Sequence, residues 1–407
     1  MGYKTIKIGS FSFRITFLRI VLLLVASFGA STMLYRLVFG LGSVTNLNDS
    51  WPFGLWIGVD VMLGVALAAG GFTTAALYYI FNLKDFKSLS KPAILTAWIG
   101  YLLVVVGLGM DVGLWYNWWR PLFSWGYTSV LFEVFTCVMV YNVVLLVEFL
   151  PVISKRFKWK KVYQVTTKIA IPAVIAGIVL SSMHQSSLGA LFVIMPEKLH
   201  PLWYTSLLPW LFLFSAVIVG PAMVTIEASL ASSAYKMEFE KHVLAKLSKG
   251  IAILLTLYVG LKLWDLQARG HIGTMFEGTL PSNMFLIEMS LFIIPILIVM
   301  FTSKNASQRA ISWSASLVVA GVVVNRLNIL FTGLYQAAPM GYIPAITEFA
   351  VSFGIISMGC LAYLFIVENF EVFEPEAENN PFVENQQKGL APEYVLDMDS
   401  KQQSLSK

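Results

Sequence analysis

The sequence predicts an all-α, polytopic membrane protein with about ten transmembrane helices, and two observations carry this prediction. Hydrophobic residues make up 57% of the 407 positions and charged residues only 13%, whereas a soluble domain has about 25% charged residues. The apolar residues also gather into ten stretches long enough to cross a bilayer, since a hydrocarbon core of about 30 Å takes roughly 20 helical residues. The composition therefore excludes an ordinary soluble domain.

The expected spans follow one another near residues 17–40, 53–81, 93–114, 126–150, 169–194, 206–234, 248–268, 283–301, 309–334 and 345–367. The second is longer than a bilayer requires, so we expect it to tilt or to project from the membrane. The chain up to residue 370 is predicted to be one membrane domain. The remainder, 371–407, is acidic and rich in Asn and Gln, which favours a mostly disordered tail. The basic N-terminus leads directly into a span of signal-anchor length, so no cleavable signal is predicted.

Basic residues are distributed unevenly between the two sides of the membrane. Only three of the 28 Lys and Arg residues fall in loops opposite the termini, namely Arg120, Lys198 and Arg269. Three more lie within spans, and all the others lie on the side of the termini. The positive-inside rule therefore predicts that both termini are cytoplasmic.

Six carboxylic acids fall inside the apolar spans, where a charge costs roughly 2.5–3.5 kcal/mol on insertion scales. They are Asp60, Asp111, Glu133, Glu227, Glu288 and Glu348. The spans hold only three basic residues, so about half of the acids are expected to lack a cationic partner. An unpaired carboxyl in a low dielectric favours its neutral form, and a group that can be neutral or charged suits a proton relay. The alternative is that each acid satisfies a local hydrogen bond or an interhelical pair.

In the predicted orientation, most of these polar residues lie in the outer half of the membrane, whereas Glu148 and Glu227 lie toward the cytoplasm. His184 is the only histidine well inside a span. A transmembrane b-haem normally takes two histidines on facing helices, so a single one argues against haem. We expect His184 either to exchange protons or to be a buried structural residue. Neither cysteine belongs to a CxxC or Cys/His cluster, so no zinc or iron–sulfur site is expected.

A polar external segment, residues 46–52, leads directly into the second span. Its Trp51, and Trp56 shortly after it, fit either the aromatic belt of a membrane protein or an aromatic entrance above Asp60. Within the same span, small residues recur at spacings of three and four, which predicts close helix packing. In the ninth span, Arg326 stands between two asparagines and is expected to pair with Glu288 or Glu348.

Five motifs occur in order along the chain: GLGSVTNLN (40–48), WPFGLWIGVD (51–60), LFE (131–133), MHQSSLG (183–189) and LHPLW (199–203). Together they resemble the NrfD/PsrC family, and most closely its HybB-like branch. The resemblance extends over about residues 30–368, with ten spans. This branch includes the membrane subunits of hydrogenase-2 and of the Hmc and Qrc respiratory complexes.

The resemblance implies two four-helix bundles, formed by spans 2–5 and 6–9, with the first and last spans flanking them. It implies a subunit that carries no haem, iron–sulfur cluster or metal and that binds menaquinone or a related quinone near the outer surface of a prokaryotic cytoplasmic membrane. Electrons would pass between this quinone and a ferredoxin-like iron–sulfur subunit on the external face. That subunit would connect to a hydrogenase, a multihaem cytochrome c or a molybdopterin subunit in anaerobic respiration, with proton translocation in some members.

Matching the motifs residue by residue implies a site. The quinone headgroup, and its protonation, are expected at Asp60, His184, Asp111 and Glu133. The mouth of the pocket is expected at Asn46, Asn48, Trp51 and Trp56. A proton path is expected along Glu148, Glu227, Glu288, Arg326 and Glu348. An ion-coupled secondary transporter and a passive membrane anchor of an external oxidoreductase remain as alternatives, although the external position of the polar cluster disfavours transport.

Overall fold

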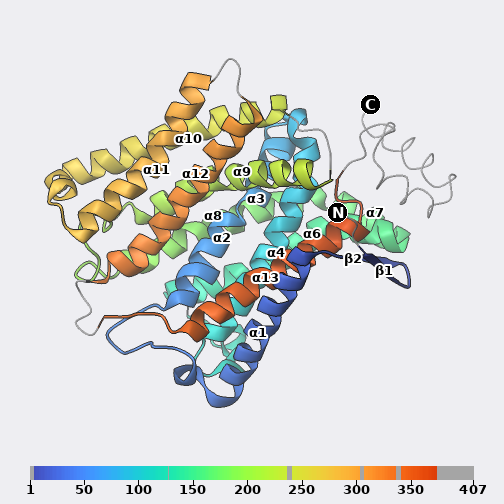
Figure 1. The fold of residues 1–407 in the computed structure, drawn as a ribbon, viewed down its shortest axis with the longest axis horizontal. Coiled ribbons are helices and arrows are strands. Elements are labelled where there is room, and N and C mark those ends of the chain that lie inside the picture. The colour runs from blue at the N-terminus through green and yellow to red at the C-terminus, as the bar shows by residue number, and fades with distance from the viewer. Residues whose placement is uncertain (1–3, 127, 236–240, 303–306, 336–340, 374–407) are drawn as a thin grey trace.

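The computed structural model describes residues 4–373, except for residues 127, 236–240, 303–306 and 336–340 (Figure 1). In this part of the chain, ten helices are long and apolar enough to cross a membrane, which confirms the predicted fold class. They are α1 (Phe17–Phe39), the second span (Ile57–Ile80), α4 (Lys87–Asp111), α6 (Val130–Phe157), α8 (Ala170–Val193), α9 (Leu208–Tyr235), α10 (Lys241–Ala268), α11 (Leu280–Thr302), α12 (Gln308–Leu327) and α13 (Ile346–Asn369). The bounds of the spans differ most from expectation at α4, α6 and α10, because these helices continue through charged residues that the apolar pattern excluded.

The spans form two four-helix bundles and a flanking pair (Figure 1). In the first bundle, the second span packs against α4 and α8, and α6 packs against the same two helices. In the second bundle, α9 to α12 pack against one another. Helix α9 also packs against α8 and the middle of the second span, and so joins the two bundles. Helices α1 and α13 pack along each other and cover α4 on the outside of the first bundle. This is the arrangement expected from the sequence.

The second span is not the single long helix that the sequence predicts. It consists of a π-helical segment (Ile57–Leu63), α2 (Gly64–Leu67), α3 (Gly70–Ala75) and a second π-helical segment (Ala76–Ile80). The break between α2 and α3 frees backbone carbonyls, which inside a membrane need a partner within the protein. The Gln185 side chain donates to the carbonyl of Val65 at 2.9 Å. The carbonyl of Ala69 accepts from the backbone N–H of Thr73 at 3.2 Å and from Thr73 Oγ1 at 2.9 Å.

Small residues bring the second span close to α4, as predicted. A Cβ atom at Gly71 would lie 2.4 Å from the Cβ of Ala97, and one at Gly100 would lie 2.8 Å from the Cβ of Ala68. Real side chains do not approach so closely, so these contacts depend on glycine. The stripe of small residues is therefore a packing surface.

A π-helical segment also ends the ninth span, where α12 continues as Asn328–Thr332. It lies against the π-helical start of the second span, since a Cβ atom at Gly58 would lie 2.2 Å from Cδ2 of Leu330. The two bundles thus touch through two irregular helical segments. Such segments occur frequently at functional sites.

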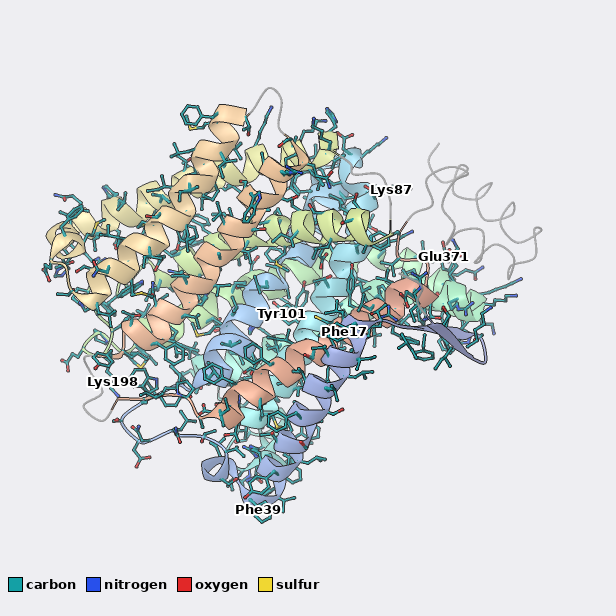
Figure 2. The ribbon with its side chains drawn as sticks, viewed as in Figure 1. Phe17, Phe39, Lys87, Tyr101, Lys198 and Glu371 are labelled. Carbon is teal, nitrogen blue, oxygen red and sulfur yellow. The ribbon has the colours of Figure 1, made fainter. Side chains whose placement is uncertain are left out.

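Both described ends of the chain lie at one end of the helices, which we call the terminal face (Figure 1). Lys87 and Glu371 lie at this face, and Phe39 and Lys198 lie at the opposite end, which we call the loop face (Figure 2). The terminal face carries an antiparallel hairpin of β1 (Lys4–Ile8) and β2 (Phe11–Ile15) and the short helix α7 (Lys160–Lys168). The remaining helical turns are Leu41–Ser43, Lys84–Phe86, Trp115–Asn117, α5 (Arg120–Phe123) and Ile272–Phe276.

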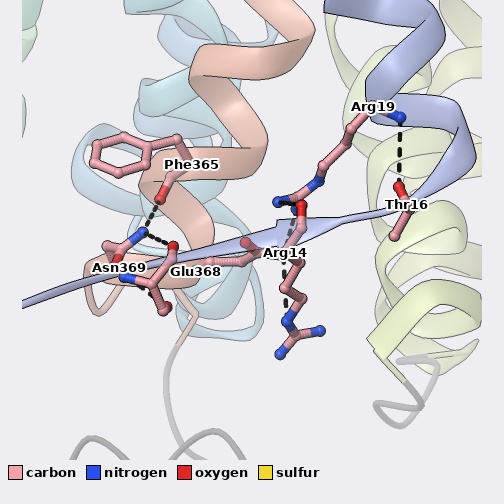
Figure 3. A network of polar contacts seen from close by, with 7 residues as sticks. Arg14, Thr16, Arg19, Phe365, Glu368 and Asn369 are labelled. Carbon is pink, nitrogen blue, oxygen red and sulfur yellow. Dashed lines mark hydrogen bonds and ion pairs between the residues drawn. The ribbon is translucent and has the colours of Figure 1, made fainter. Parts of the chain in front are cut away.

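The hairpin, which the sequence analysis did not predict, is anchored to the end of α13 (Figure 3). Ser12 N donates to Asn369 Oδ1 at 2.8 Å, and Asn369 Nδ2 donates to the carbonyl of Ser12 at 3.0 Å. The buried carboxylate of Glu368 accepts a hydrogen bond from Arg19 at 2.5 Å and lies 3.5 Å from Arg14 Nε. These contacts join the first and last spans at the terminal face.

Most of the predicted tail, residues 374–407, lies outside the described residues. Its first residues pack on the terminal face. Val372 is buried in a cluster with Phe149 and Phe370, and Glu371 forms an ion pair with Lys155 at 2.7 Å. The chain after α13 therefore lies along the end of α6.

Candidate functional site

Asp60 lies at the loop-face end of the first bundle, where the bundle meets the flanking helix α13. It belongs to the π-helical start of the second span and is 5% exposed. One carboxylate oxygen accepts a hydrogen bond from Ser352 Oγ at 2.8 Å, and the other is buried without a partner among the described residues. On the side of α4, a Cβ atom at Gly107 would lie only 2.6 Å from the Cβ of Asp60. Asp60 therefore occupies a tight seam and keeps one oxygen for a further ligand or a water molecule.

Glu348, near the start of α13, holds the neighbouring loops together. Its carboxylate accepts hydrogen bonds from the Tyr342 hydroxyl and from the backbone N–H groups of Asn46 at 3.0 Å and Ala345 at 2.9 Å. The indole N–H of Trp56 donates to the carbonyl of Glu348 at 3.1 Å. Burial and the hydrogen bond to Glu348 raise the pKa of Tyr342, so this hydroxyl stays a donor. Both oxygens of Glu348 are thus occupied.

Arg36 of α1 lies against the end of α4. Its Nε donates to the carbonyl of Met110 at 2.8 Å and its Nη2 donates to the carbonyl of Val112. The guanidinium therefore spans the turn that holds Asp111, and a cation at this position also complements the C-terminal end of the helix dipole. Arg36 is fully buried, and its Nη1 has no partner in the described part of the chain.

The four residues expected at the mouth of the pocket are held in place by contacts within the protein. The side chains of Asn46 and Asn48 each donate, at 3.0 Å, to a backbone carbonyl of the loop before α13. Trp51 is 4% exposed and packs on the ring of Tyr342, with the ring centroids 5.6 Å apart. Trp56 is only 1% exposed. Both tryptophans lie inside the protein, so they are not part of an aromatic belt at the membrane surface.

His184 lies deeper in the first bundle, on α8. It is fully buried, and neither ring nitrogen has a partner among the described residues. Its ring centroid lies 5.9 Å from that of Tyr101, whose hydroxyl is 3.4 Å from Ser181 Oγ. Buried polar groups are normally hydrogen-bonded, so an unpartnered imidazole marks a place for a water molecule or a ligand.

Helix α4 gives the relative depth of three predicted site residues. Asp60 lies against Gly107 of α4, and His184 lies beside the ring of Tyr101. Glu227 accepts a hydrogen bond from Thr96. With a rise of about 1.5 Å per residue, the first two levels are about 9 Å apart and the last two about 8 Å apart. The three groups therefore follow α4 from the loop face toward the terminal face, in steps longer than one hydrogen bond.

The other two acids of the first bundle lie on α6. Glu133 is half-buried in the first turn and has no hydrogen-bond partner among the described residues. Glu148 is also half-buried and packs on α8, since a Cβ atom at Gly177 would lie 2.9 Å from its Oε1. No contact given by the described residues joins Glu133 to the other residues expected at the headgroup.

A second buried polar cluster surrounds Glu288 in the second bundle. The carboxylate is fully buried and forms an ion pair with Lys262. It also accepts hydrogen bonds from Asn325 at 2.8 Å, Trp203 at 2.9 Å and Asn328 at 3.0 Å. A cavity of about 10 Å³ beside Lys262 and Asn325 has room for about one water molecule. With four donors, Glu288 is saturated.

Arg326 does not form the expected ion pair with Glu288 or Glu348 in the described part of the chain. Its guanidinium donates to Asn325 Oδ1 and to Ser215 Oγ, both at 2.7 Å, and stacks 3.7 Å from the centroid of the Phe212 ring. Asn325 therefore bridges Arg326 and the carboxylate. The cation that pairs with Glu288 is Lys262 instead of Arg326.

Sequence reasoning missed several residues that complete these clusters. Ser352 follows Glu348 by four positions, so the helical period alone places both on one face of α13 and could have indicated it. Tyr342 and Trp203 lie in loops, and no local pattern indicates that they fold back onto buried acids. His200 also lies in a loop, where its backbone N–H donates to the carbonyl of Gly333 at 2.8 Å. Burial lowers the pKa of His200.

Comparison with known proteins gives a consistent match over most of the chain. A family model described as polysulphide reductase, NrfD, matches residues 43–338. A protein of Nitratidesulfovibrio vulgaris is 37% identical over 348 residues, which are 83% of this chain and 89% of the relative. A protein of Escherichia coli described as "probable Ni/Fe-hydrogenase 2 b-type cytochrome subunit" is 32% identical over 352 residues, 85% of this chain and 89% of the relative. The menaquinone reductase integral membrane subunit of Nitratidesulfovibrio vulgaris is 27% identical over 386 residues, with the same two shares.

Proposed function

The chain belongs to the NrfD family, as a membrane subunit of the quinone-linked respiratory oxidoreductases, and we propose that it binds a quinone at the seam between the first bundle and α13. There it exchanges electrons between the membrane quinone pool and a ferredoxin-like iron–sulfur subunit docked on the loop face. The quinone is menaquinone or a related molecule, as the name of one relative suggests. The excess of basic residues on the terminal face supports a cytoplasmic terminal face and an external loop face, and we propose that the membrane is the cytoplasmic membrane of a prokaryote.

The observation that carries this proposal is the incomplete hydrogen bonding at the loop face. Within the described part of the chain, one buried oxygen of Asp60 and one buried nitrogen of Arg36 have no partner, and both residues lie beside the last two turns of α4. A quinone headgroup has two oxygens, which can accept a hydrogen bond from a cation and exchange a proton with a carboxyl group. Quinol oxidation releases two protons together with two electrons, so groups that titrate beside the ring are required.

We assign the proton exchange to Asp60 and His184, with Asp111 and Glu133 nearer the edge of the site. From the level of His184, protons would pass toward the terminal face through Glu227 and Glu148, with ordered water molecules bridging the steps along α4. The saturated cluster of the second bundle suits a different role. There Glu288 and Arg326 join four helices rather than transfer protons, and Glu348 in the same way fixes the loops around the site.

We further propose that this chain transfers electrons without a haem of its own, although one relative is described as a b-type cytochrome subunit. A transmembrane b-haem normally takes two histidine ligands on facing helices. In the described part of the chain, His184 is the only histidine well inside a span, since His242 is the second residue of α10 and the other two lie in loops. The electrons then pass directly between the quinone and the docked iron–sulfur subunit.

The test is quinone-linked turnover in membranes that contain the chain with its natural partners. Asp60→Asn keeps the shape of the side chain but removes the exchangeable proton, and we expect turnover to fall at least tenfold, since a positioned acid–base group contributes about 10²–10⁴-fold. Asp49→Asn makes the same chemical change on an exposed loop of the same face and should leave turnover unchanged. His184→Gln is the second test of the site.

Unchanged turnover in both Asp60→Asn and His184→Gln would refute this site. Absence of quinone-analogue binding to the intact complex would favour a passive anchor, and ion uptake by the purified chain in liposomes would favour a transporter. Purification of the chain in mild detergent should recover an iron–sulfur protein together with a hydrogenase, a multihaem cytochrome c or a molybdopterin subunit. Mass spectrometry of the copurified chains identifies which of them it is.

A further inference from the structure

We propose that the segment from the last turn of α6 to the start of α8, residues 155–169, is a binding surface for anionic phospholipid headgroups on the terminal face. Six basic residues lie in this segment: Lys155, Arg156, Lys158, Lys160, Lys161 and Lys168. No acidic residue occurs between Glu148 and Glu197. The segment therefore carries a local positive charge that its own sequence does not balance.

The loops before α4 and α10, on the same face, mix the two signs of charge. Asp85 lies among the lysines of the loop before α4, and it forms an ion pair with Lys246 of α10 at 2.5 Å. The loop before α10 contains two glutamates beside its lysines, at positions 238 and 240. The excess of positive charge between α6 and α8 therefore goes beyond the general bias of cytoplasmic loops.

The position of α7 follows from its connections. Helix α6 ends at Phe157, Lys158 turns the chain in the left-handed conformation (φ 58°), and α8 begins at Ala170. Because α6 and α8 both cross the membrane, the nine residues of α7 lie at the membrane boundary. The exposed side chains of α7 include apolar ones as well as lysines, such as Val165, 58% exposed. A basic helix with exposed apolar residues has the composition of an interfacial helix.

The start of this segment is hollowed. A shallow and widely open groove is lined by Lys158, Trp159, Lys160, Lys161 and Val162. The indole of Trp159 stacks on the ring of Phe157, with centroids 5.3 Å apart, and is half exposed beside the lysines. A phospholipid could place its phosphate between the lysine ammonium groups and its acyl chains on the membrane side of Trp159. The phosphate would balance the positive charge, and the acyl chains would cover the apolar surface.

Three of the six basic residues, Lys155, Arg156 and Lys160, already have partners within the described part of the chain. Lys155 pairs with Glu371, and Arg156 donates to the carbonyl of Ser10 at 2.6 Å. The groove and the exposed face of α7 beyond it therefore carry the proposal. A basic residue close to an anionic membrane surface strengthens binding about fivefold. Three lysines together account for about a hundredfold.

The test measures phosphatidylglycerol and phosphatidylcholine retained by the full chain, by native mass spectrometry over a lipid titration. The variant K158Q/K161Q/K168Q removes three charges from the proposed surface. The matched control, K84Q/K241Q/K249Q, removes three exposed charges from other parts of the terminal face. We expect the first variant to lower the affinity for phosphatidylglycerol about a hundredfold, with little change for phosphatidylcholine, and the control to change either by less than about fivefold.

Equal losses in the two variants would overturn the proposal, because they would show a general effect of the charge of the face. The acidic tail of this chain is the competing occupant, since residues 374–407 contain seven acidic and three basic residues. A further variant that ends at residue 373 separates the two. If the full chain binds phosphatidylglycerol no better than phosphatidylcholine and only the shortened chain prefers it, the tail occupies the surface and the lipid proposal fails.

Discussion

Replacing Lys262 by methionine would remove the cation that is bonded to the carboxylate of Glu288 at the centre of the second bundle, with little change in side-chain length. Glu288 would keep three neutral donors, but its charge would lose the ammonium group that compensates it. Breaking a buried ion pair by removing one partner costs about 3–5 kcal/mol. The three remaining hydrogen bonds to a charged group, each worth about 1.5–3 kcal/mol, hold the carboxylate in place but do not neutralise it. We expect a loss of about 3 kcal/mol in the free energy of unfolding, at the lower end of that range.

The pairwise part of this energy can be isolated with a second substitution. Glu288→Gln alone leaves Lys262 buried against the ring of Phe285, with Nζ 5.0 Å from the ring centroid. The double variant removes both charges, so it should be more stable than Lys262→Met alone. We expect the two substitutions to be coupled by at least about 1.5 kcal/mol, within the range measured for residues in direct contact.

The assay is unfolding of the purified chain by titration with sodium dodecyl sulfate in mixed micelles, followed by circular dichroism. Lys246→Met is the matched control, because it breaks an ion pair of similar length to Asp85 in which both side chains are about half exposed. Water and salt screen such a pair, so its loss should be small. If Lys262→Met lowers the free energy of unfolding no more than Lys246→Met, or if the double variant is simply additive, the buried pair does not stabilise the second bundle as argued.

Three further changes test the first bundle and the loops. Gly107→Ala places a Cβ atom 2.6 Å from that of Asp60. The overpacking costs about 1–3 kcal/mol and should reduce quinone-linked turnover. Gly109→Ala is the control, because its Cβ atom would meet nothing within 4 Å and turnover should not change. Gln185→Leu leaves a carbonyl at the break in the second span without its donor and should lower the free energy of unfolding by about 1–3 kcal/mol in the same titration. Because burial lowers the pKa of His200 below its usual 6.5, the unfolded chain binds more protons there and stability falls as the pH drops below about 6.5. His200→Gln should flatten that part of a plot of unfolding temperature against pH.

The number and order of the spans could be predicted because lipid imposes one requirement, a continuous apolar helix of about 20 residues, on each of them. The break in the second span could not be predicted from the same pattern. Alanine and glycine at positions 68–71 are as compatible with close helix packing as with an interruption. The residue that indicates the break is Gln185 on α8, whose amide donates to the freed carbonyl of Val65. This role can be recognised only once α8 and the second span are known to be neighbours.

The acids of the candidate site could be predicted from their cost in a membrane, but their partners could not. The count of charges assumed that each buried cation pairs with one acid. Arg36 instead donates to two backbone carbonyls, and Arg326 donates to an amide and a hydroxyl oxygen. A guanidinium has five N–H donors that any oxygen can accept, so counting cations overestimates how many carboxylates are neutralised.

The two buried clusters differ in one property that bears directly on function. Every oxygen of Glu288 has donors, including an ammonium group, so any loss or gain of a proton there breaks contacts that join α10, α11 and α12. Among the described residues, Asp60 has one hydrogen bond and one buried oxygen without a partner, and neither ring nitrogen of His184 has a partner. A proton can therefore be added or removed at these two residues without breaking a network, and a substrate oxygen or water molecule would complete their hydrogen bonding. On these grounds we propose that the first bundle carries the chemistry and that the second bundle stabilises the structure at the end where the two π-helical segments meet.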